Sequence, residues 1–315
     1  MEKYPKITII TPSYNQGAFI EDTILSIINQ GYPNLQYIII DGGSTDNTVD
    51  IIKKYDKYIY YWISEKDNGQ SNAINKGLKL ALGDLVNWIN SDDLLYEKAL
   101  FDIANLYIKN RDKKLFIGQT QVFALNKEYG KGGDIIFSSS EDTFAFGQMN
   151  QPAMFYSKDA IVKIGFLNES LHYCMDIDWW LKYLLYYPIN TIEQSKNTWS
   201  RFRIHNESKT VSTPLYFKKE KYKLYKDVFK FYGLSNPNTG KWNLNNTYPI
   251  TTHLNLKKTL NYYHLWRSDE LMLEKKTKMS FKFLMKVNPL KLNFLGFKRY
   301  IAVLKNNILN LVSSK

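Results

Sequence analysis

The sequence predicts an α/β protein in which a mostly parallel central sheet is flanked by helices. Two features of the first hundred residues support this fold class. Short apolar runs alternate with segments of helical spacing, and polar residues follow three of the apolar runs. Strands that alternate with helices in this way form βαβ units with right-handed crossovers, and such units build a parallel sheet.

Four apolar runs predict strands, and three segments between them predict helices. The first run, Ile7-Thr8-Ile9-Ile10-Thr11, is β-branched, as expected for a buried strand. The other strands are expected at residues 37–40, 58–64 and 85–89, and the helices at residues 19–30, 46–55 and 71–82. Ser44-Thr45-Asp46 offers cap candidates for the second helix.

The pattern becomes mixed between about residues 98 and 209. Strands are expected at residues 115–118 and 198–204, and a helix at residues 176–187. The glycine-rich residues 130–133 predict a turn or a mobile loop. The least readable segments are residues 125–155 and the surroundings of Trp179, where loops are expected.

Charge divides the chain into two parts. The net charge is +12, but residues 216–315 alone hold 20 Lys and Arg against 5 Asp and Glu. Composition therefore predicts a first domain at residues 1–214, with halves at about 1–95 and 96–214, and a basic, aromatic, mainly helical extension at residues 215–315. A strongly basic tail indicates an anionic partner such as lipid, nucleic acid or an acidic substrate.

Other totals restrict the class of protein. The single cysteine, Cys174, excludes an internal disulfide and fits a reducing compartment. The first residues lack the apolar core of a signal peptide, and no run of about 18 apolar residues occurs. We therefore expect a cytoplasmic protein that does not cross a membrane.

The polar residues after the strands are candidates for ligand binding, because open α/β sheets bind ligands at the carboxyl ends of their strands. Tyr14, after the first strand, either offers an aromatic face to a nucleobase or packs in a tight turn. Asp41 is followed by two glycines, which allow close backbone approach to a ligand; the alternative is a simple βα turn. No Gly-x-Gly-x-x-Gly follows the first strand, which argues against a nicotinamide dinucleotide site.

The stretch Asn90-Ser91-Asp92-Asp93 is the most informative of these strand ends. Two adjacent carboxylates at the end of a buried strand suit a hard divalent cation such as Mg²⁺ or Mn²⁺, which in turn holds a diphosphate. The alternative is a helix cap or a turn.

These segments, in this order, resemble the family 2 glycosyltransferases of GT-A fold. The resemblance extends over roughly residues 5–210. It is carried by the blocks Ile7-Thr8-Ile9-Ile10-Thr11-Pro12-Ser13-Tyr14-Asn15, Asp41-Gly42-Gly43-Ser44-Thr45-Asp46, Gly69-Gln70-Ser71-Asn72-Ala73-Ile74-Asn75-Lys76-Gly77, Asn90-Ser91-Asp92-Asp93, Met175-Asp176-Ile177-Asp178-Trp179-Trp180 and Arg203-Ile204-His205-Asn206-Glu207-Ser208-Lys209-Thr210.

The resemblance implies an inverting, metal-dependent sugar transferase of bacterial surface-polysaccharide type, moving a hexosyl or N-acetylhexosaminyl group. Tyr14 would stack on the base of a UDP-sugar donor and Asp41 would hydrogen bond to it. Mn²⁺ or Mg²⁺ would be held by Asp92, Asp93 and His205, and Asp176 would be the general base. The implied donor site consists of Pro12, Ser13, Tyr14, Asp41, Gly69, Asn72, Asn90 and Ser91.

Several residues leave alternatives open. Asn90 stands where many members have an aspartate, so it either weakens metal binding or contacts the ribose. Asp178 competes with Asp176 for the role of base, although Asp176 occupies the family's position. His205 is a metal ligand or a surface histidine. Trp179 and Trp180 stack on an acceptor sugar or pack in the core.

The basic tail has two interpretations. Apolar residues interleave with lysine and arginine, which is typical of a surface that contacts anionic membrane at the inner face, where lipid-linked saccharide acceptors lie. The alternative is helices packed on the catalytic domain. The residues concerned are Phe281, Phe283, Leu284, Val287, Leu290, Leu292, Phe294, Leu295, Phe297, Lys282, Lys286, Lys291, Lys298 and Arg299.

Two competing functions remain at this point. A nucleotidyltransferase would need a glycine- and lysine-rich phosphate loop near Tyr14, which is missing. A non-catalytic nucleotide-sugar-binding protein of a membrane-associated assembly is the alternative that Asn90 suggests. Nucleic acid is not an expected partner, because no recognised binding module accompanies the charge.

Overall fold

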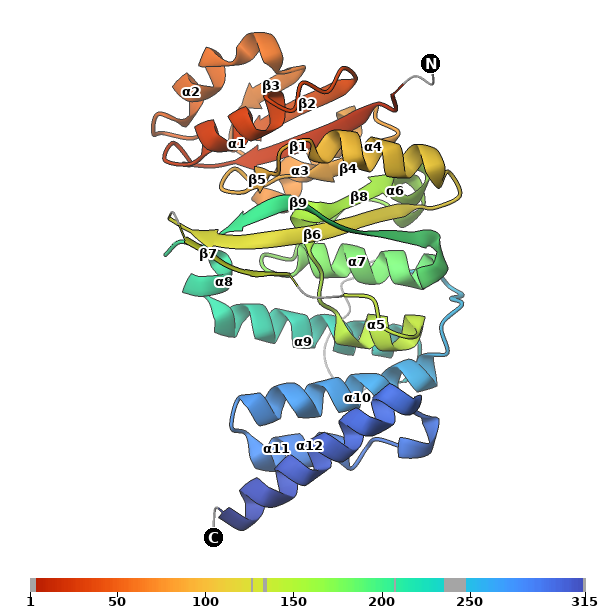
Figure 1. Cartoon of the computed structure of the whole chain (residues 1–315). Coiled ribbons are helices and arrows are strands. Elements are labelled where there is room, and N and C mark those ends of the chain that lie inside the picture. Colours follow the sequence, from red (N-terminus) through yellow and green to blue (C-terminus); the bar gives the residue numbers. More distant parts are fainter. Residues whose placement is uncertain (1–3, 126, 133–134, 207, 235–247, 314–315) are drawn as a thin grey trace. The chain divides into compact units, whose positions relative to one another are not determined.

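The computed structural model describes residues 4–125, 127–132, 135–206, 208–234 and 248–313 (Figure 1). The chain divides into two compact units. The first comprises residues 1–134 and 149–222, and the second comprises residues 135–148 and 223–315. This division differs from the domains expected from composition, since residues 135–148 belong to the second unit and the later boundary falls inside helix α9 (Pro214–Phe231).

The first unit opens with the parallel sheet that the sequence predicts. The strands have the order β3-β2-β1-β4, and the three pairings among them are all parallel. The strands are β1 (Ile7–Ser13), β2 (Leu35–Asp41), β3 (Tyr61–Ser64) and β4 (Leu85–Trp88), and the helices between them are α1 (Ile20–Ile28), α2 (Thr48–Lys54) and α3 (Gln70–Leu80). The third strand begins later than predicted, because Asp56–Tyr58 forms a 3-10 turn first.

The rest of the first unit is mixed rather than parallel. The sheet continues from β4 in the order β8-β6-β9-β5, and β7 pairs with β6. Among the strand pairings of the described residues in this part, β6 with β9 is the only parallel one. The strands are β5 (Leu94–Leu95), β6 (Leu115–Ala124), β7 (Lys127–Lys131), β8 (Met154–Ser157) and β9 (Ile192–Arg203), and the helices are α4 (Ala99–Lys109), α6 (Lys158–Ile164), α7 (Met175–Tyr186) and α8 (Lys209–Ser212), with 3-10 turns at Gln151–Ala153 and Ile189–Thr191.

The turn or mobile loop expected at residues 130–133 is wrong for its described part. Gly130 and Lys131 belong to β7, where Lys131 pairs with Gln121 of β6. The amide of Gly132 then donates to the carbonyl of Thr120 at 2.7 Å. A strand partner thus satisfies this backbone, and the absent side chains of the glycines do not prevent pairing. Gly133 lies outside the described residues.

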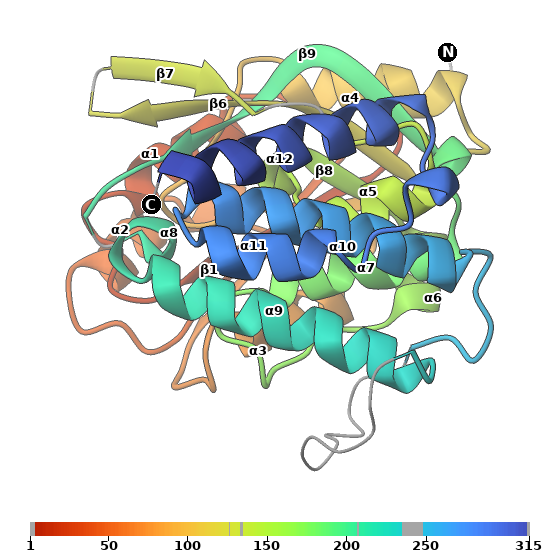
Figure 2. The same cartoon turned by 90° about the horizontal axis from the view of Figure 1, so that it is seen from below.

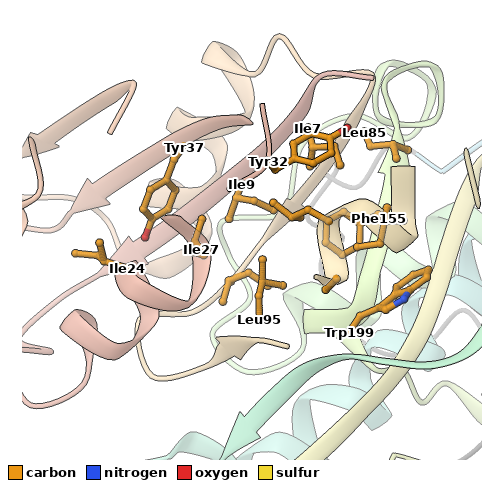
Figure 3. Packing of buried hydrophobic residues seen from close by; sticks show 14 of the residues in the cluster. Ile7, Ile9, Ile24, Ile27, Tyr32, Tyr37, Leu85, Leu95, Phe155 and Trp199 are labelled. Carbon is orange, nitrogen blue, oxygen red and sulfur yellow. The ribbon is translucent and has the colours of Figure 1, made fainter. Parts of the chain in front are cut away.

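The core of the first unit lies where α1 packs against the sheet (Figure 3). Ile7 and Ile9 of β1 are fully buried, together with Ile24 and Ile27 of α1. Each such side chain contributes about 1.5–3 kcal/mol through burial. Helix α3 packs closely against Ile10 of β1. Gly77 of α3 allows this approach, because an added Cβ would lie 2.5 Å from Cγ2 of Ile10.

The second unit is helical, as expected for the basic extension. It contains α5 (Ser140–Phe146), the end of α9, α10 (Leu256–Leu273), α11 (Thr277–Leu284), a 3-10 turn at Pro289–Lys291 and α12 (Phe294–Ser313). Helices α10, α11 and α12 lie side by side (Figures 1 and 2). Their core contains Leu265, Leu284, Val287 and Val303.

The apolar residues of the tail therefore do not form one surface. Leu284 and Val287, expected on a membrane-facing side, are buried in the helical core because α10 and α12 cover them. Leu290, Phe294, Leu295 and Phe297 remain exposed, as do Lys286, Lys291 and Lys298. Among the described residues, no helix is both long and apolar enough to cross a membrane.

Candidate active site

A cavity of about 710 Å³ lies at the carboxyl ends of the parallel strands. The ends of β1 and β4 and the Gly42–Gly43 turn after β2 line it, together with the start of α7 and three residues beyond β9, namely His205, Ser208 and Lys209. Nine of the residues predicted from the sequence meet here: Pro12, Ser13, Tyr14, Gly69, Asn90, Ser91, Asp92, Asp176 and His205. Asp41, Asn72 and Asp93 do not line the cavity.

The end of β1 brings both an aromatic ring and unpaired polar atoms to this cavity. The Tyr14 side chain is 61% exposed, so the ring is available for stacking. The hydroxyl of Ser13 and Oε1 of Gln16 are buried, and neither has a hydrogen-bond partner among the described residues. A buried polar atom without a partner is costly, and a ligand in the cavity would remove that cost.

Asp41, at the end of β2, has its carboxylate enclosed by the chain. Oδ2 accepts hydrogen bonds from the amides of Gly43 and Ser44 at 3.1 and 2.9 Å and from the hydroxyl of Ser64 at 2.6 Å. Oδ1 accepts from the hydroxyl of Ser44 at 2.5 Å. The side chain is fully buried, and only the following Gly42 and Gly43 face the cavity. Asp41 thus holds the shape of the glycine turn.

Asp92 and His205 come from distant parts of the chain and meet at the cavity. Oδ2 of Asp92 lies 2.9 Å from Nε2 of His205, and both side chains are partly exposed. Arg203 at the end of β9 donates to the carbonyl of Asp92 at 2.9 Å, and the Phe19 ring lies 4.6 Å from the imidazole. These contacts fix the imidazole beside the carboxylate.

Although Asp92 lines the cavity, the side chain of the adjacent Asp93 does not. The side chain is fully buried, with Oδ1 accepting from the amide of Arg203 at 3.0 Å and Oδ2 from the Asn90 amide group at 3.2 Å. Burial, and next the charge of Asp92, raise the pKa of Asp93 well above its usual range. The metal role predicted for Asp93 stays a prediction, and its observed contacts are with β9.

Asp92 and His205 supply part of a ligand set for a divalent cation. One carboxylate oxygen and one imidazole nitrogen at 2.9 Å suit Mn²⁺ or Mg²⁺ only if a ligand and water complete the shell. Among the described residues, no three His, Cys, Asp or Glu side chains are grouped closely enough to hold a metal alone. The residues fit a cation that arrives with a diphosphate.

The N-terminus of α3 supports the loop that carries Asp92. Gln70 donates from Nε2 to Oδ1 of Asn90 at 2.9 Å, and Gly69 before it has a φ of 103°, which favours glycine. Asn72 faces another way, donating to Oε2 of Glu169 at 3.0 Å. Asn90 therefore has partners within the chain at both ends of its amide.

Asp176 and Asp178 occupy very different surroundings on the first turn of α7. Asp176 lines the cavity, and enclosure by protein raises its pKa to about 6. Asp178 is fully buried and forms an ion pair with the buried Lys182 at 2.9 Å. Trp179 and Trp180 are also buried, which places both rings in the core. Of the two carboxylates, only Asp176 lines the cavity.

Two residues that sequence reasoning missed complete the site. Lys209 lines the cavity, and Nζ donates to Oε1 of Gln70 at 3.0 Å. Glu220 accepts from the amides of His172, Tyr173 and Cys174 at 3.1, 2.6 and 2.7 Å, and so fixes the loop before Asp176. Lys209 was part of the block that carries the family resemblance, but no pattern distinguished it from a solvated lysine.

Residues 8–159 match the family model described as Glycosyl transferase family 2, so this segment is a domain of that family. The resemblance carried by the sequence motifs is thereby confirmed for this segment. The matched segment contains the ends of β1, β2 and β4. Asp176, His205 and Lys209 lie beyond it.

Relatives by sequence include two proteins named as glycosyltransferases, one of Staphylococcus aureus and one, named as putative, of Bacillus subtilis. The chain is 30% identical over 218 residues to the poly(ribitol-phosphate) beta-N-acetylglucosaminyltransferase TarP of Staphylococcus aureus (strain N315), an alignment that covers 61% of this chain and 65% of TarP. It is 41% identical over 92 residues to TuaG of Bacillus subtilis (strain 168), covering 28% of this chain and 36% of TuaG. The chain therefore spans less than two thirds of either relative.

Solved structures share the fold at low sequence identity. S. aureus TarS 1–349 in complex with UDP-GlcNAc has a TM-score of 0.63 at 15% identity, covering 97% of this chain and 81% of that one. The mannosyltransferase PcManGT from Pyrobaculum calidifontis, in complex with GDP-Man and Mn²⁺, has a TM-score of 0.56 at 13% identity, covering 100% and 89%. The GT-A fold class expected from the sequence is confirmed.

Proposed function

We propose that this chain is a metal-dependent, inverting glycosyltransferase that moves a sugar from a nucleoside-diphosphate donor to a saccharide hydroxyl. The observation that carries the proposal is that Asp176, with a pKa of about 6, opens onto the same cavity as the Asp92–His205 pair. The end of the cavity at Asp92 and His205 suits a diphosphate and its cation, and the end at Asp176 suits a hydroxyl that must lose a proton.

The donor binds, in this proposal, at the ends of β1 and β2. Tyr14 stacks on the base, and the unpaired polar atoms of Ser13 and Gln16 hydrogen bond to the nucleoside. Asp41 acts through the Gly42–Gly43 turn that it holds, since its carboxylate is fully buried and does not line the cavity. A UDP-sugar is the proposed donor, supported by the fold shared with TarS bound to UDP-GlcNAc.

Asp92 and His205 would hold Mn²⁺ or Mg²⁺ together with the donor diphosphate. The cation would supply Lewis-acid stabilisation of the departing phosphate charge. Arg203 and Phe19 keep the side chains of Asp92 and His205 in place before the donor binds. Asp93 contributes by tying the loop to the amide of Arg203.

Asp176 accepts the proton of the attacking hydroxyl. Its raised pKa makes the carboxylate a stronger base than an exposed aspartate, while it remains mostly ionised at neutral pH. General-base help of this kind contributes about 10²–10⁴-fold in rate. Glu220 and Lys209 hold the backbone of residues 172–174, and thereby place Asp176.

The proposed acceptor is a saccharide of a bacterial surface polysaccharide, either free or lipid-linked. The relationship to TarP, which is named for a poly(ribitol-phosphate) acceptor, supports this class. Peripheral contact with the inner face of the plasma membrane is proposed through the exposed residues Leu290, Phe294, Leu295 and Phe297 and their neighbouring lysines. Co-sedimentation with phosphatidylglycerol vesicles, but not with phosphatidylcholine vesicles, tests this contact.

A screen of nucleotide sugars by thermal shift, with and without Mn²⁺, tests the main proposal. A donor present at 100 times its dissociation constant should add about 2.7 kcal/mol of stability. The donor that stabilises the chain is then used in a hydrolysis and transfer assay. Absence of binding by every nucleotide sugar would overturn the proposal.

The non-catalytic alternative predicts a different pattern. A degenerate binding protein would bind the donor and show no turnover with any acceptor. The contacts of Asn90 argue against it, because Gln70 and Asp93 hold that residue and Asp92 still reaches the cavity.

A further inference from the structure

Lys209 is a cavity residue to which neither the family match nor the metal pair assigns a role. It lies at the start of α8, four residues after His205. Nζ donates to Oε1 of Gln70 at 3.0 Å and to the carbonyl of His172 at 3.2 Å. An ammonium has three N–H donors, so these two bonds leave one for a ligand in the cavity.

The contacts of Lys209 connect the two ends of the cavity. On one side, Gln70 donates to Asn90, which in turn donates to Asp93 beside the metal pair. On the other side, His172 precedes the helix that carries Asp176. Lys209 therefore stands between the cation end of the cavity and the base end.

Electrostatics support the same location. Loss of solvation lowers the pKa of Lys209, whereas the carboxylates of Asp176, Glu220 and Asp92 oppose that change. The ammonium of Lys209 thus lies among carboxylates, including Asp92 of the proposed metal site and Asp176, the proposed base, and their negative charges favour its charged form. A phosphate oxygen entering the cavity would be one more acceptor, and a charged one.

We propose that Lys209 is a binding residue for the donor diphosphate, using its third N–H to hold the phosphate that leaves with the nucleoside. The inference rests on the proposed function. During transfer the bond between the anomeric carbon and the phosphate oxygen breaks, and its electron pair stays on the phosphate. The acceptor oxygen bonds to the anomeric carbon and passes its proton to Asp176. Lys209 offsets the new phosphate charge without itself transferring a proton.

Binding of UDP and UMP to the full chain tests this role by calorimetry. Lys209→Met keeps the length of the side chain and removes its charge. Loss of a charge-assisted hydrogen bond should weaken UDP binding about 10- to 100-fold. UMP lacks the leaving phosphate, so its affinity should stay within about threefold. Lys209→Arg should recover part of the UDP affinity.

Lys53→Met is the matched control, since it removes one lysine charge from the exposed surface of α2. It should leave both affinities unchanged. Equal UDP binding by wild type and Lys209→Met would overturn the inference, and so would equal loss of UDP and UMP, because that pattern belongs to a merely structural residue. Failure of the wild-type chain to bind UDP or GDP would instead contradict the proposed function.

Discussion

The cavity wall and the layer directly behind it contain the same kind of residue in different roles. Asp92 and Asp176 open onto the cavity, whereas Asp93 and Asp178, one and two positions later, are fully enclosed. Asp93 bonds to the amide of Arg203, and Asp178 pairs with Lys182. Among the described residues, Asp92 contacts His205 and Asp176 accepts from the amide of Ile177, and both remain open to the cavity.

A carboxylate at a strand end or helix start can therefore bind a ligand only if the rest of the chain leaves its oxygens exposed to the cavity. Asp41 makes the same point at the end of β2, where four donors from the chain surround its two oxygens. The enclosed carboxylates hold the backbone on which the open ones stand. Replacing members of the two groups should therefore affect different quantities.

The largest effect is expected at the base. Asp176→Asn removes the proton acceptor and should lower the rate of transfer about 10²- to 10⁴-fold. Donor affinity should change little, because the donor binds at the other strand ends. Single-turnover transfer and donor titration measure the two quantities separately, and full activity of the variant would refute the assignment.

The same variant provides a control for folding. The pKa of Asp176 is raised in the folded chain, so the charged carboxylate destabilises the fold at neutral pH. Asparagine should therefore raise the melting temperature at pH 7. That gain should shrink as the pH falls, and vanish below about pH 4, where the aspartate is protonated in both states.

Replacing the enclosed Asp178 should lower stability and leave the rate of transfer unchanged, the opposite of the result expected for Asp176. Asp178→Asn leaves the buried ammonium of Lys182 without its partner, and breaking a buried pair costs about 3–5 kcal/mol of folding stability. Denaturant unfolding measures this loss. The fraction that stays folded should transfer sugar normally, and a large drop in its specific activity would place Asp178 in the reaction.

Asp92 and Asp93 allow an open and an enclosed carboxylate to be compared within one motif. Asp92→Asn should weaken Mn²⁺-dependent UDP binding by about 10- to 100-fold, because a cation ligand is lost. Asp93→Ala should mainly lower the melting temperature, since the amide of Arg203 loses its acceptor. UDP titrations with Mn²⁺ and with chelator distinguish the outcomes. Equal metal dependence in wild type and Asp92→Asn would contradict the cation site.

The smallest effect is a pH dependence. Only the carboxylate form of Asp176 accepts a proton, and its pKa is about 6. The value of kcat/KM should therefore fall about tenfold for each pH unit below 6 and become level above about pH 7. A profile of kcat/KM against pH checks this, with Asp176→Asn expected to lose the acidic limb.

Much of the fold was predictable because its signal is local. The β-branched run at Ile7 and the helical spacing of Ile20, Ile24 and Ile27 depend on neighbouring residues only, and each formed its element. The mixed half was harder to predict. The strand that contains Gly130 exists because β6 lies beside it, and no local preference of glycine indicates that partner.

The site divides in the same way. The order of the amino acids specifies which carboxylates, aromatic ring and histidine are available and sets most of them at strand ends, because residue types and their spacing are local properties of the chain. Long-range packing selects those that face the cavity. It brought His205 to within 2.9 Å of Asp92, enclosed Asp41, Asp93 and Asp178, and placed Lys209 among the site residues. Whether a charged group is open or satisfied depends on donors that lie far away in sequence and meet it only after folding.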